Sequence, residues 1–439
     1  MNPSETLQAS GRQALKRLRE LLEQATPENR DRAKLLAAFR QHTEREPAAA
    51  AREILGTLAQ TVDAYLRGGA SSDALQYYLA AQFGIAGPEL GDLPERLDPL
   101  RDPQLAPEIQ AYTEREPAKE LPKISVIITT YNRKDYLRQA VESILRQDYP
   151  HFEIVVIDDC SSDGTCEMVE RHFSGEPRVI YMRNRQNRGP GHNRRQALAA
   201  HGDGELILFL DDDDYLIDSG YFTRAALFHL QHPDISFVAA NVFLEYTAGG
   251  RFAVSSLQLD RITPQRNYFR HFEQPGYPKP ASTLTAVFKR EALMKMDILN
   301  MKMVNDASIY LRALLIGDAG FIDTLAGVYR IHGNNITFHL SQSFLIENLE
   351  EKRLIRDMAA DRLGFGRAEL NEWFAHNVYD TVSYYLLNSA KNHSDYKAMY
   401  DWTRLHCPDA YHRLKRSFRT RLMKKQLLRV SFVRALLGR

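Results

Sequence analysis

The chain has 439 residues, a length that corresponds to roughly three domains of ~150 residues each. Its 57 Lys and Arg residues nearly balance its 56 Asp and Glu residues, and the net charge of +1 argues against a nucleic-acid-binding protein. The three cysteines form an odd and sparse set, which argues against a disulfide-stapled secreted scaffold and favours a reducing compartment.

Membrane and export signals are missing from the sequence pattern. No apolar run approaches the ~20 residues that a bilayer-spanning helix needs. The first residues, Met-Asn-Pro-Ser-Glu-Thr, lack the basic segment and apolar stretch of a secretory signal. We therefore expect a cytoplasmic protein, either soluble or peripherally attached at the inner face of the membrane.

The first 87 residues have the spacing of a helical domain. Leu55, Leu58, Val62 and Tyr65 recur every three to four residues, as one buried helical face requires. Seven of the 19 prolines then lie between Pro88 and Pro122. Because proline lacks an amide donor and disfavours helix in the preceding residue, residues 88–122 are predicted to form an extended linker.

Residues 123–340 have the pattern of an α/β domain. Short apolar runs rich in β-branched residues occur at 124–130, 153–157, 178–181 and 205–210, and an amphipathic helix is predicted over 136–145. Strands that alternate with helices form right-handed βαβ units, so we expect a mixed, mainly parallel sheet covered on both faces. Ligands of such sheets bind beyond the carboxyl ends of the strands.

The last part of the chain, residues 341–439, is predicted to be a helical region with a basic amphipathic tail. The stretch from Tyr411 to Arg439 contains ten Lys or Arg residues and no acidic residue, with apolar residues between them. This pattern suits a peripheral contact with an anionic membrane, and a solvated helix packed on the α/β domain is the alternative.

Three polar clusters follow predicted strands and should meet at one edge of the sheet. They are Thr129–Arg133, Asp158–Thr165 and the aspartate run Asp211–Asp214. Carboxylates a few Å apart raise one another's pKa, and burying them without a counter-charge is costly. A divalent cation removes both problems, and hard oxygen ligands suit Mg²⁺ or Mn²⁺. A solvated acidic turn is the plain alternative for the aspartate run.

These motifs resemble those of family 2 glycosyltransferases, which have the GT-A fold. The resemblance rests on Ile124–Arg133, the Asp158-Asp159 strand end, Asn187-x-Gly189 and the Asp-rich strand end, in that order. It covers roughly residues 123–340, about half of the chain, and neither flank shows a comparable likeness.

The resemblance implies roles for the residues at the first, second and fourth strand ends. Thr129 and Asp159 match positions that contact the nucleotide base, where a carboxylate accepts from a ring imide N–H. In the Asp-x-Asp-Asp motif, Asp213 ligates the metal and Asp211 contacts the ribose or completes the metal site. The remaining positions assigned to nucleotide-sugar binding are Tyr131, Arg133 and Asp212. For Asp159 the alternative is a turn-forming or helix-capping role.

Downstream of the glycine-containing loop that begins at Asn187-Arg188-Gly189, Arg194 matches the family arginine that lies near the diphosphate or donor sugar. A bidentate cation is a natural partner for that group, and a surface helix arginine is the alternative. The sequence has Asn193 and Arg195 where Ala and Asn are usual in the family, so it departs from the family pattern around this arginine.

Two later residues complete the implied site. Asp306 matches the aspartate that serves as catalytic base, although Asn305 replaces the usual Glu before it. A helix cap is the alternative for Asp306. His332 matches a segment that contacts the metal or diphosphate in some members, and a hydrogen-bonded structural histidine is its alternative.

The resemblance implies a metal-dependent, inverting glycosyltransferase with a UDP- or dTDP-linked donor. The expected acceptor is a hydroxyl of a glycan or a lipid-linked glycan, as in synthesis of surface polysaccharide or lipopolysaccharide, and a protein acceptor is the alternative. The helical regions are candidates for acceptor docking or oligomerisation. Two rival classes are a sugar nucleotidyltransferase, which normally has a Gly-rich loop after its first strand, and a non-catalytic protein on a decayed transferase domain.

Overall fold

The computed structural model describes residues 3–24, 32–67, 70–86, 89–100, 121–333, 341–390 and 393–416. The chain divides into two compact units. The first comprises Met1–Gln265, Pro278–Leu299 and Gly317–His332, and the second comprises Arg266–Tyr277, Asn300–Ile316 and Gly333–Arg439. Among the described helices, none is long and apolar enough to cross a membrane.

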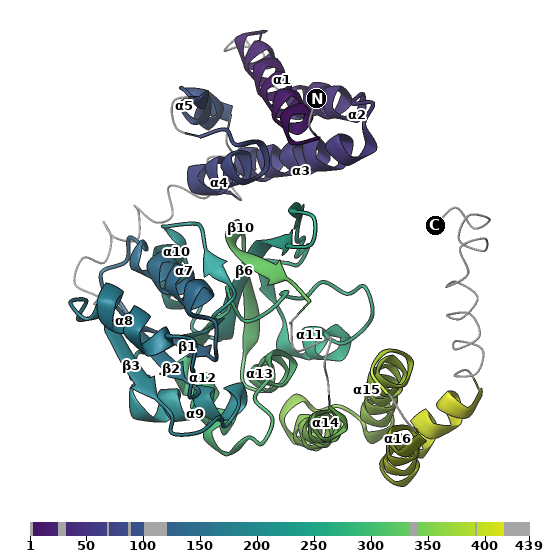
Figure 1. Ribbon diagram of the computed structural model, residues 1–439. Coiled ribbons are helices and arrows are strands. Elements are labelled where there is room, and N and C mark those ends of the chain that lie inside the picture. Colours follow the sequence, from purple (N-terminus) through teal and green to yellow (C-terminus); the bar gives the residue numbers. More distant parts are fainter. Residues whose placement is uncertain are drawn as a thin grey trace. The chain divides into compact units, whose positions relative to one another are not determined.

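A mixed, mainly parallel sheet forms the centre of the first unit (Figure 1), as predicted. Its strands lie in the order β3-β2-β1-β4-β9-β6-β10-β5. The neighbours β3-β2-β1-β4 are parallel, as are β6 and β10, while β9 runs antiparallel between β4 and β6. The strands are β1 (Ile124–Thr130), β2 (Phe152–Asp158), β3 (Val179–Arg183), β4 (Leu206–Asp211), β5 (Tyr215–Leu216), β6 (Ile235–Tyr246), β7 (Arg251–Val254), β8 (Ile262–Thr263), β9 (Val287–Lys289) and β10 (Asp318–Ile331).

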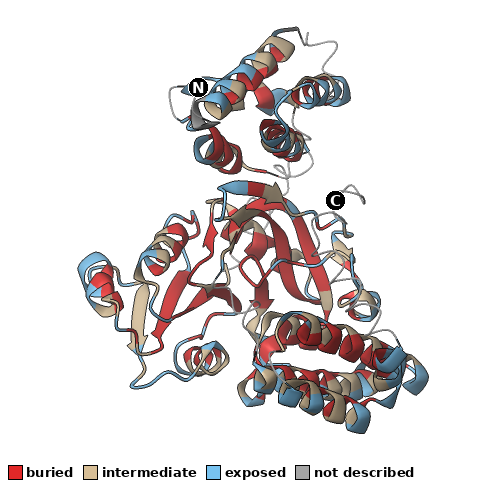
Figure 2. Ribbon diagram, turned by 45° about the vertical axis from the view of Figure 1, so that its right-hand side comes forward, coloured by how far each residue is buried: buried red, intermediate tan, exposed pale blue. Residues whose placement is uncertain are grey.

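Helices alternate with the parallel strands and cover the sheet. α7 shows the reason: Leu137, Ala140, Val141 and Ile144 recur on one face and are fully buried. Figure 2 shows buried residues along the strands and on the inner faces of these helices. All seven residues of β1 and of β2 are buried, as expected for strands covered on both faces. The helices are α7 (Lys134–Leu145), α8 (Thr165–Phe173), α9 (Pro190–Ala200), α10 (Tyr221–Gln231) and α12 (Arg290–Lys295). A further helix, α11 (Gln265–His271), belongs from Arg266 onward to the second unit.

The predicted N-terminal helices are present and share a core with the sheet. Tyr78 of α4 is fully buried and stacks on Phe243 of β6, with ring centroids 5.4 Å apart. The Thr57 hydroxyl of α3 donates to the Phe252 carbonyl at 3.4 Å. This part of the chain therefore folds against β6 and β7, and the boundary at residue 87 stays a prediction. The helices are α1 (Pro3–Gln24), α2 (Arg32–Glu44), α3 (Ala49–Leu66), α4 (Ser72–Phe83) and α5 (Leu93–Leu97).

The proline-rich segment differs from the extended linker that was predicted. Its described beginning contains the short helix α5, with Pro94 in the first turn, where its missing N–H costs nothing. Leu93 and Leu97, four residues apart, are both fully buried in the core of the N-terminal helices. Burial of this apolar pair explains why the segment begins as a helix; residues 101–120 lie outside the described residues.

The second unit is helical, as expected for the C-terminal region. α14 begins after the N-cap Ser341, whose side chain accepts from Phe344 N–H, and ends at Gly364 in the left-handed conformation. A buried ion pair joins Arg312 of α13 to Glu351 of α14. The tail from residue 417 onward, which carries the predicted membrane contact, lies outside the described residues. The helices are α13 (Asp306–Ala313), α14 (Gln342–Leu363), α15 (Arg367–Asn388) and α16 (His393–His406).

Candidate active site

The polar clusters that follow β1, β2 and β4 lie at one edge of the sheet, as predicted. In the strand register, Thr129 pairs with Asp211 across β1 and β4, and Thr130 pairs with Asp158 across β1 and β2. The parallel direction of the three strands brings their carboxyl ends together, so residues far apart in the sequence become neighbours.

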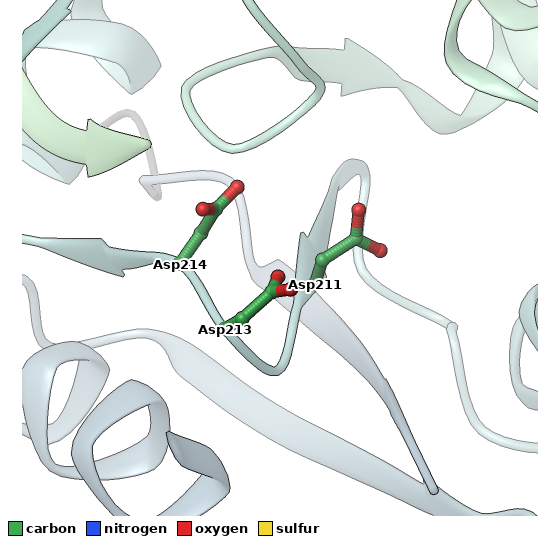
Figure 3. A group of neighbouring side chains, drawn as sticks. All are labelled: Asp211, Asp213 and Asp214. Carbon is green, nitrogen blue, oxygen red and sulfur yellow. The ribbon is translucent and has the colours of Figure 1, made fainter. Parts of the chain in front are cut away.

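The aspartate run makes a turn between β4 and β5, and three of its side chains converge. One carboxylate oxygen each from Asp211, Asp213 and Asp214 lies within 4.8 Å of the others (Figure 3). Asp211 is partly exposed, and Asp213 and Asp214 are buried. Three convergent carboxylates with one open side match the ligand chemistry of Mg²⁺ or Mn²⁺, which leave part of their coordination shell to substrate phosphates. The residues present therefore fit a divalent ion.

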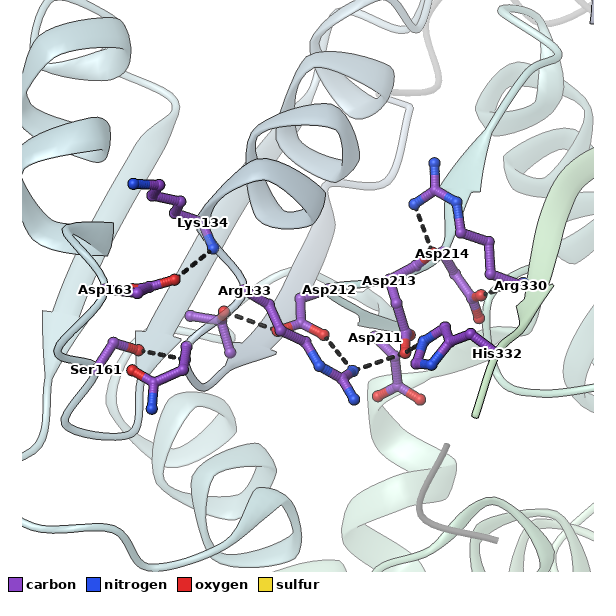
Figure 4. Close-up of polar contacts among 12 residues, drawn as sticks. Arg133, Lys134, Ser161, Asp163, Asp211, Asp212, Asp213, Asp214, Arg330 and His332 are labelled. Atoms are coloured by element: carbon purple, nitrogen blue, oxygen red, sulfur yellow. Dashed lines mark hydrogen bonds and ion pairs between the residues drawn. The ribbon is translucent and has the colours of Figure 1, made fainter. Parts of the chain in front are cut away.

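The side chain of the fourth aspartate, Asp212, forms hydrogen bonds with residues of the first strand end. Its carboxylate accepts from the Thr130 hydroxyl at 2.7 Å and from the Arg133 guanidinium at 3.0 Å. The same guanidinium nitrogen also donates to Asp213 at 2.6 Å (Figure 4). Arg133 therefore ties the loop after β1 to the aspartate run and supplies a positive charge beside it.

Burial makes the ionised form of this cluster costly. Burial, together with the charge of Asp213, raises the pKa of Asp212 to about 7, although the Arg133 charge opposes the rise. Burial followed by the charges of Asp213 and Asp211 raises the pKa of Asp214 well above its ordinary value. A divalent cation held by the carboxylates would offset this repulsion, because opposite charge favours the ionised form.

The end of β10 closes the other side of the aspartate run. His332 Nε2 lies 2.9 Å from Asp213 Oδ2, and the Arg330 guanidinium donates to the Asp213 carbonyl at 2.8 Å. The Arg330 backbone N–H donates to Asp214 at 3.0 Å, and the Ser282 hydroxyl donates to the same carboxylate at 3.2 Å. These bonds hold Asp213 and Asp214 in place from several directions (Figure 4).

Asp159, directly after β2, organises the loop that leads into α9. Its two carboxylate oxygens accept from the backbone N–H groups of Arg188 and Gly189, both at 2.8 Å, and from the Asn184 amide at 3.0 Å. Burial alone would raise the pKa of Asp159, but these bonds to the ionised form outweigh it and lower the pKa. The loop then enters α9, where the Arg194 guanidinium donates to Asp211 at 2.7 Å.

The loops after β1 and β2 contain two residues with unusual backbone conformations. Asn132 and Cys160 have φ of 54° and 69°, in the left-handed region that residues other than glycine seldom adopt. The Asn132 N–H donates to the Ser161 hydroxyl at 2.8 Å, and its side-chain carbonyl accepts from Ser162 N–H at 2.7 Å. Such strained residues concentrate at ligand sites, and their position beside the carboxylates agrees with that tendency.

Comparison with known proteins assigns this domain to a family. A sequence model described as "Glycosyl transferase family 2" matches residues 125–296. Residues 125–296 form a glycosyltransferase family 2 domain.

Relatives of the family 2 domain are bacterial glycosyltransferases. The poly(ribitol-phosphate) β-N-acetylglucosaminyltransferase TarS of Staphylococcus aureus is 36% identical over 115 residues, which cover 26% of this chain and 20% of TarS. A Campylobacter jejuni GalNAc(5)-diNAcBac-PP-undecaprenol β-1,3-glucosyltransferase is 39% identical over 104 residues, covering 24% of this chain and 33% of that protein. The aligned region therefore spans between a fifth and a third of the length of these two relatives.

Solved structures show the same fold. The crystal structure of TarS 1–349 in complex with UDP-GlcNAc superposes with a TM-score of 0.52 and 21% identity, covering 68% of this chain and 92% of that one. The family 2 domain therefore has the GT-A fold that its motifs led us to expect.

The structure brings most of the predicted site residues of this domain together. Arg133, Asp212, Asp213 and His332 form one hydrogen-bonded group. Asp211, which is bonded to Arg194, lies beside this group with a carboxylate oxygen within 4.8 Å of one from Asp213. Thr129 lies beside Asp211 in the sheet, and Tyr131, directly after β1, is 48% exposed. Asp159 lies after β2, bonded to the loop before α9. Their roles toward a ligand stay predictions.

Asp306, the predicted base, lies in the second unit. It is the first residue of α13, and Asn305 before it is the N-cap, whose side chain accepts from Ser308 N–H at 2.9 Å. The capping role that was the alternative for Asp306 thus belongs to Asn305. A carboxylate in the first turn is also favoured by the helix dipole. Its role as catalytic base stays a prediction.

Sequence reasoning missed Arg330 and the rings around it. The guanidinium of Arg330 lies 4.8 Å from the ring centroid of Tyr136 and 4.4 Å from that of Tyr215. These three residues come from β10, α7 and β5, so no local spacing in the sequence connects them. The family segment that led to His332 includes Arg330 and is the signal that could have indicated it.

Proposed function

We propose that this protein is a metal-dependent, inverting glycosyltransferase that transfers a sugar from a UDP- or dTDP-linked donor to a hydroxyl of a glycan or lipid-linked glycan. The observation that carries the proposal is the carboxylate group of Asp211, Asp213 and Asp214, with oxygens within 4.8 Å, at the ligand edge of a family 2 domain. Its neighbours Arg133 and Arg194 are cations suited to a diphosphate.

In the proposed mechanism, Asp211 and Asp213 would hold the ion, with Asp214 beside them, and His332 would be a further ligand. A bound Mn²⁺ or Mg²⁺ supplies positive charge that stabilises the departing nucleoside diphosphate. Arg133 and Arg194 orient the diphosphate by bidentate hydrogen bonds. Thr129, Tyr131 and Asp159 contact the nucleoside, and Asp212 keeps Arg133 in position.

Asp306 is the proposed general base of the reaction. Its carboxylate takes the proton of the acceptor hydroxyl as that oxygen attacks the anomeric carbon of the donor sugar. The bond from the anomeric carbon to the diphosphate oxygen breaks on the opposite face. A single displacement of this kind inverts the anomeric configuration, and the leaving group is a nucleoside diphosphate.

The relatives support the donor and acceptor classes. A solved structure of TarS contains UDP-GlcNAc, and another contains UDP. The names of two relatives, from C. jejuni and Escherichia coli, specify acceptors linked to undecaprenol diphosphate. We therefore propose synthesis of a cell-surface polysaccharide, with a protein acceptor as the alternative.

A thermal-shift panel of nucleotide sugars with and without Mn²⁺ tests the donor class. A ligand at 100 times its dissociation constant stabilises the folded protein by about 2.7 kcal/mol, so a UDP- or dTDP-sugar should raise the melting temperature and GDP-mannose should not. The Mn²⁺-dependent part of the shift should disappear in Asp213→Asn. A shift with GDP-mannose alone would contradict the proposed donor class.

The released product separates the rival activities. With donor, Mn²⁺ and an acceptor preparation, we expect a nucleoside diphosphate and a product of inverted anomeric configuration by NMR. Release of pyrophosphate from a nucleoside triphosphate and a sugar phosphate would instead identify a nucleotidyltransferase. Donor turnover that is lost in Asp213→Asn would exclude a non-catalytic protein.

A further inference from the structure

The guanidinium of Arg330 lies against two aromatic rings beside the carboxylate site. Arg330 is 6% exposed, and the rings of Tyr136 and Tyr215 lie against its guanidinium at 4.8 and 4.4 Å. Cation–π contacts of this kind are strongest when the cation is desolvated, as it is here. The guanidinium also donates to Glu245 at 3.2 Å and to Gln139.

Arg330 contacts two of the three converging aspartates. Its guanidinium bonds the Asp213 carbonyl and its backbone N–H bonds the Asp214 carboxylate. Two residues further along the chain, His332 stacks on Tyr136, with centroids 5.8 Å apart, and contacts Asp213. A shift of the guanidinium would therefore move the backbone and the side chains that converge on the proposed ion.

Tyr215 connects this arginine to the N-terminal helices. It follows Asp214 directly in β5 and is 3% exposed. Its hydroxyl is hydrogen-bonded to the hydroxyl of Tyr77, which lies on α4. The Tyr77 ring also packs on Phe243 and Phe252, at centroid distances of 6.1 and 5.9 Å. Burial raises the pKa of Tyr77 above its ordinary value and that of Tyr215 to about 12, so both hydroxyls stay protonated at neutral pH.

We propose that Tyr77 is a positioning residue of the carboxylate site, acting through Tyr215 and Arg330 on Asp213 and Asp214. The N-terminal helices then contribute to metal and donor binding, beyond packing on the sheet. This inference rests on the proposed function, because it assumes that the carboxylates bind a divalent ion. Tyr77 and Tyr215, whose hydroxyls are hydrogen-bonded to each other, are 138 residues apart in the sequence.

The neighbouring Tyr78 offers a matched control. It lies on the same helix, is fully buried, and donates its hydroxyl to the Ile54 carbonyl at 2.8 Å, within the N-terminal helices. Tyr77→Phe and Tyr78→Phe each remove one part-buried hydroxyl from α4. Only the first removes a contact of Tyr215.

The test measures Mn²⁺ binding by calorimetry and by electron paramagnetic resonance of free Mn²⁺, in the full-length protein without donor. A lost hydrogen bond of ordinary strength corresponds to about three- to tenfold in affinity. We expect Tyr77→Phe to weaken Mn²⁺ binding by this factor and Tyr78→Phe to leave it unchanged. Tyr215→Phe should weaken binding similarly, and adding Tyr77→Phe to it should cause no further loss.

Two results would overturn the inference, and they differ from failure of the proposed function. Equal Mn²⁺ affinity in Tyr77→Phe and the wild type would show that Tyr77 only packs. Additive losses in the double variant would show that Tyr77 does not act through Tyr215. If the wild-type protein and Asp213→Asn both failed to bind Mn²⁺, the proposed metal site itself would be wrong.

Discussion

A buried histidine in the first unit should make the stability of the protein depend on pH. His229 of α10 is 4% exposed, and its Nε2 lies 2.8 Å from the Val287 carbonyl of β9, so the neutral ring donates this hydrogen bond. Burial lowers the pKa of His229 from 6.5 to about 3. The unfolded chain therefore takes up a proton below pH 6.5 that the folded chain does not, and stability falls as the pH falls.

The magnitude follows from the two pKa values. At pH 5 the unfolded state gains about 2 kcal/mol from protonation of this residue, and at pH 7 almost nothing. Because pH 5 is above the folded-state value of about 3, the result depends almost entirely on the unfolded-state pKa. In His229→Gln, which keeps a donor but does not titrate, this part of the pH dependence should vanish.

The assay is urea denaturation at pH 7 and pH 5, followed by far-UV circular dichroism. Tryptophan fluorescence is unsuitable because both tryptophans, Trp373 and Trp402, lie in helices of the second unit. Between pH 7 and pH 5 the wild type should lose about 2 kcal/mol more than His229→Gln. His201→Gln, at an exposed position, is the control and should behave like the wild type. The same pH dependence in the wild type and His229→Gln would refute the reasoning.

Three further predictions concern the site and the fold. Asp159→Asn should weaken UDP binding roughly tenfold by calorimetry, since an amide cannot accept two backbone N–H bonds on two oxygens; unchanged affinity would contradict this role. Arg133→Ala leaves Asp212 buried without its cation and should lower the free energy of unfolding by about 1–3 kcal/mol, measured by urea titration. Gly320→Ala should destabilise the protein by a similar amount, because the added Cβ would lie 2.5 Å from a phenylalanine ring of α10. Gly56→Ala in α3 should instead stabilise the protein by up to about 1 kcal/mol, because its Cβ meets nothing within 4 Å. Equal melting temperatures for the two glycine variants would contradict this packing.

The parts of the site that could be predicted lie within a few residues of a strand end. Asp159 and the run Asp211–Asp214 directly follow apolar stretches, and the rule that parallel strands share an edge brings them together without further information. Which of the four aspartate side chains converge could not be predicted from the sequence. Asp214, which was not among the expected metal ligands, joins the convergent carboxylates, and the reason is its contacts with Ser282 and Arg330, which are 68 and 116 residues away.

The sequence by itself determined the alternation of strands and helices, the edge at which the polar clusters meet, and the family of the central domain. These features are encoded locally, in side-chain periodicity and in short motifs at the strand ends. Only the tertiary structure decided that Arg330 lies against Tyr136 and Tyr215, and that Tyr77 of the N-terminal helices contacts this group. Contacts between distant residues depend on how whole elements pack, and this packing leaves no periodic pattern in either segment of the chain.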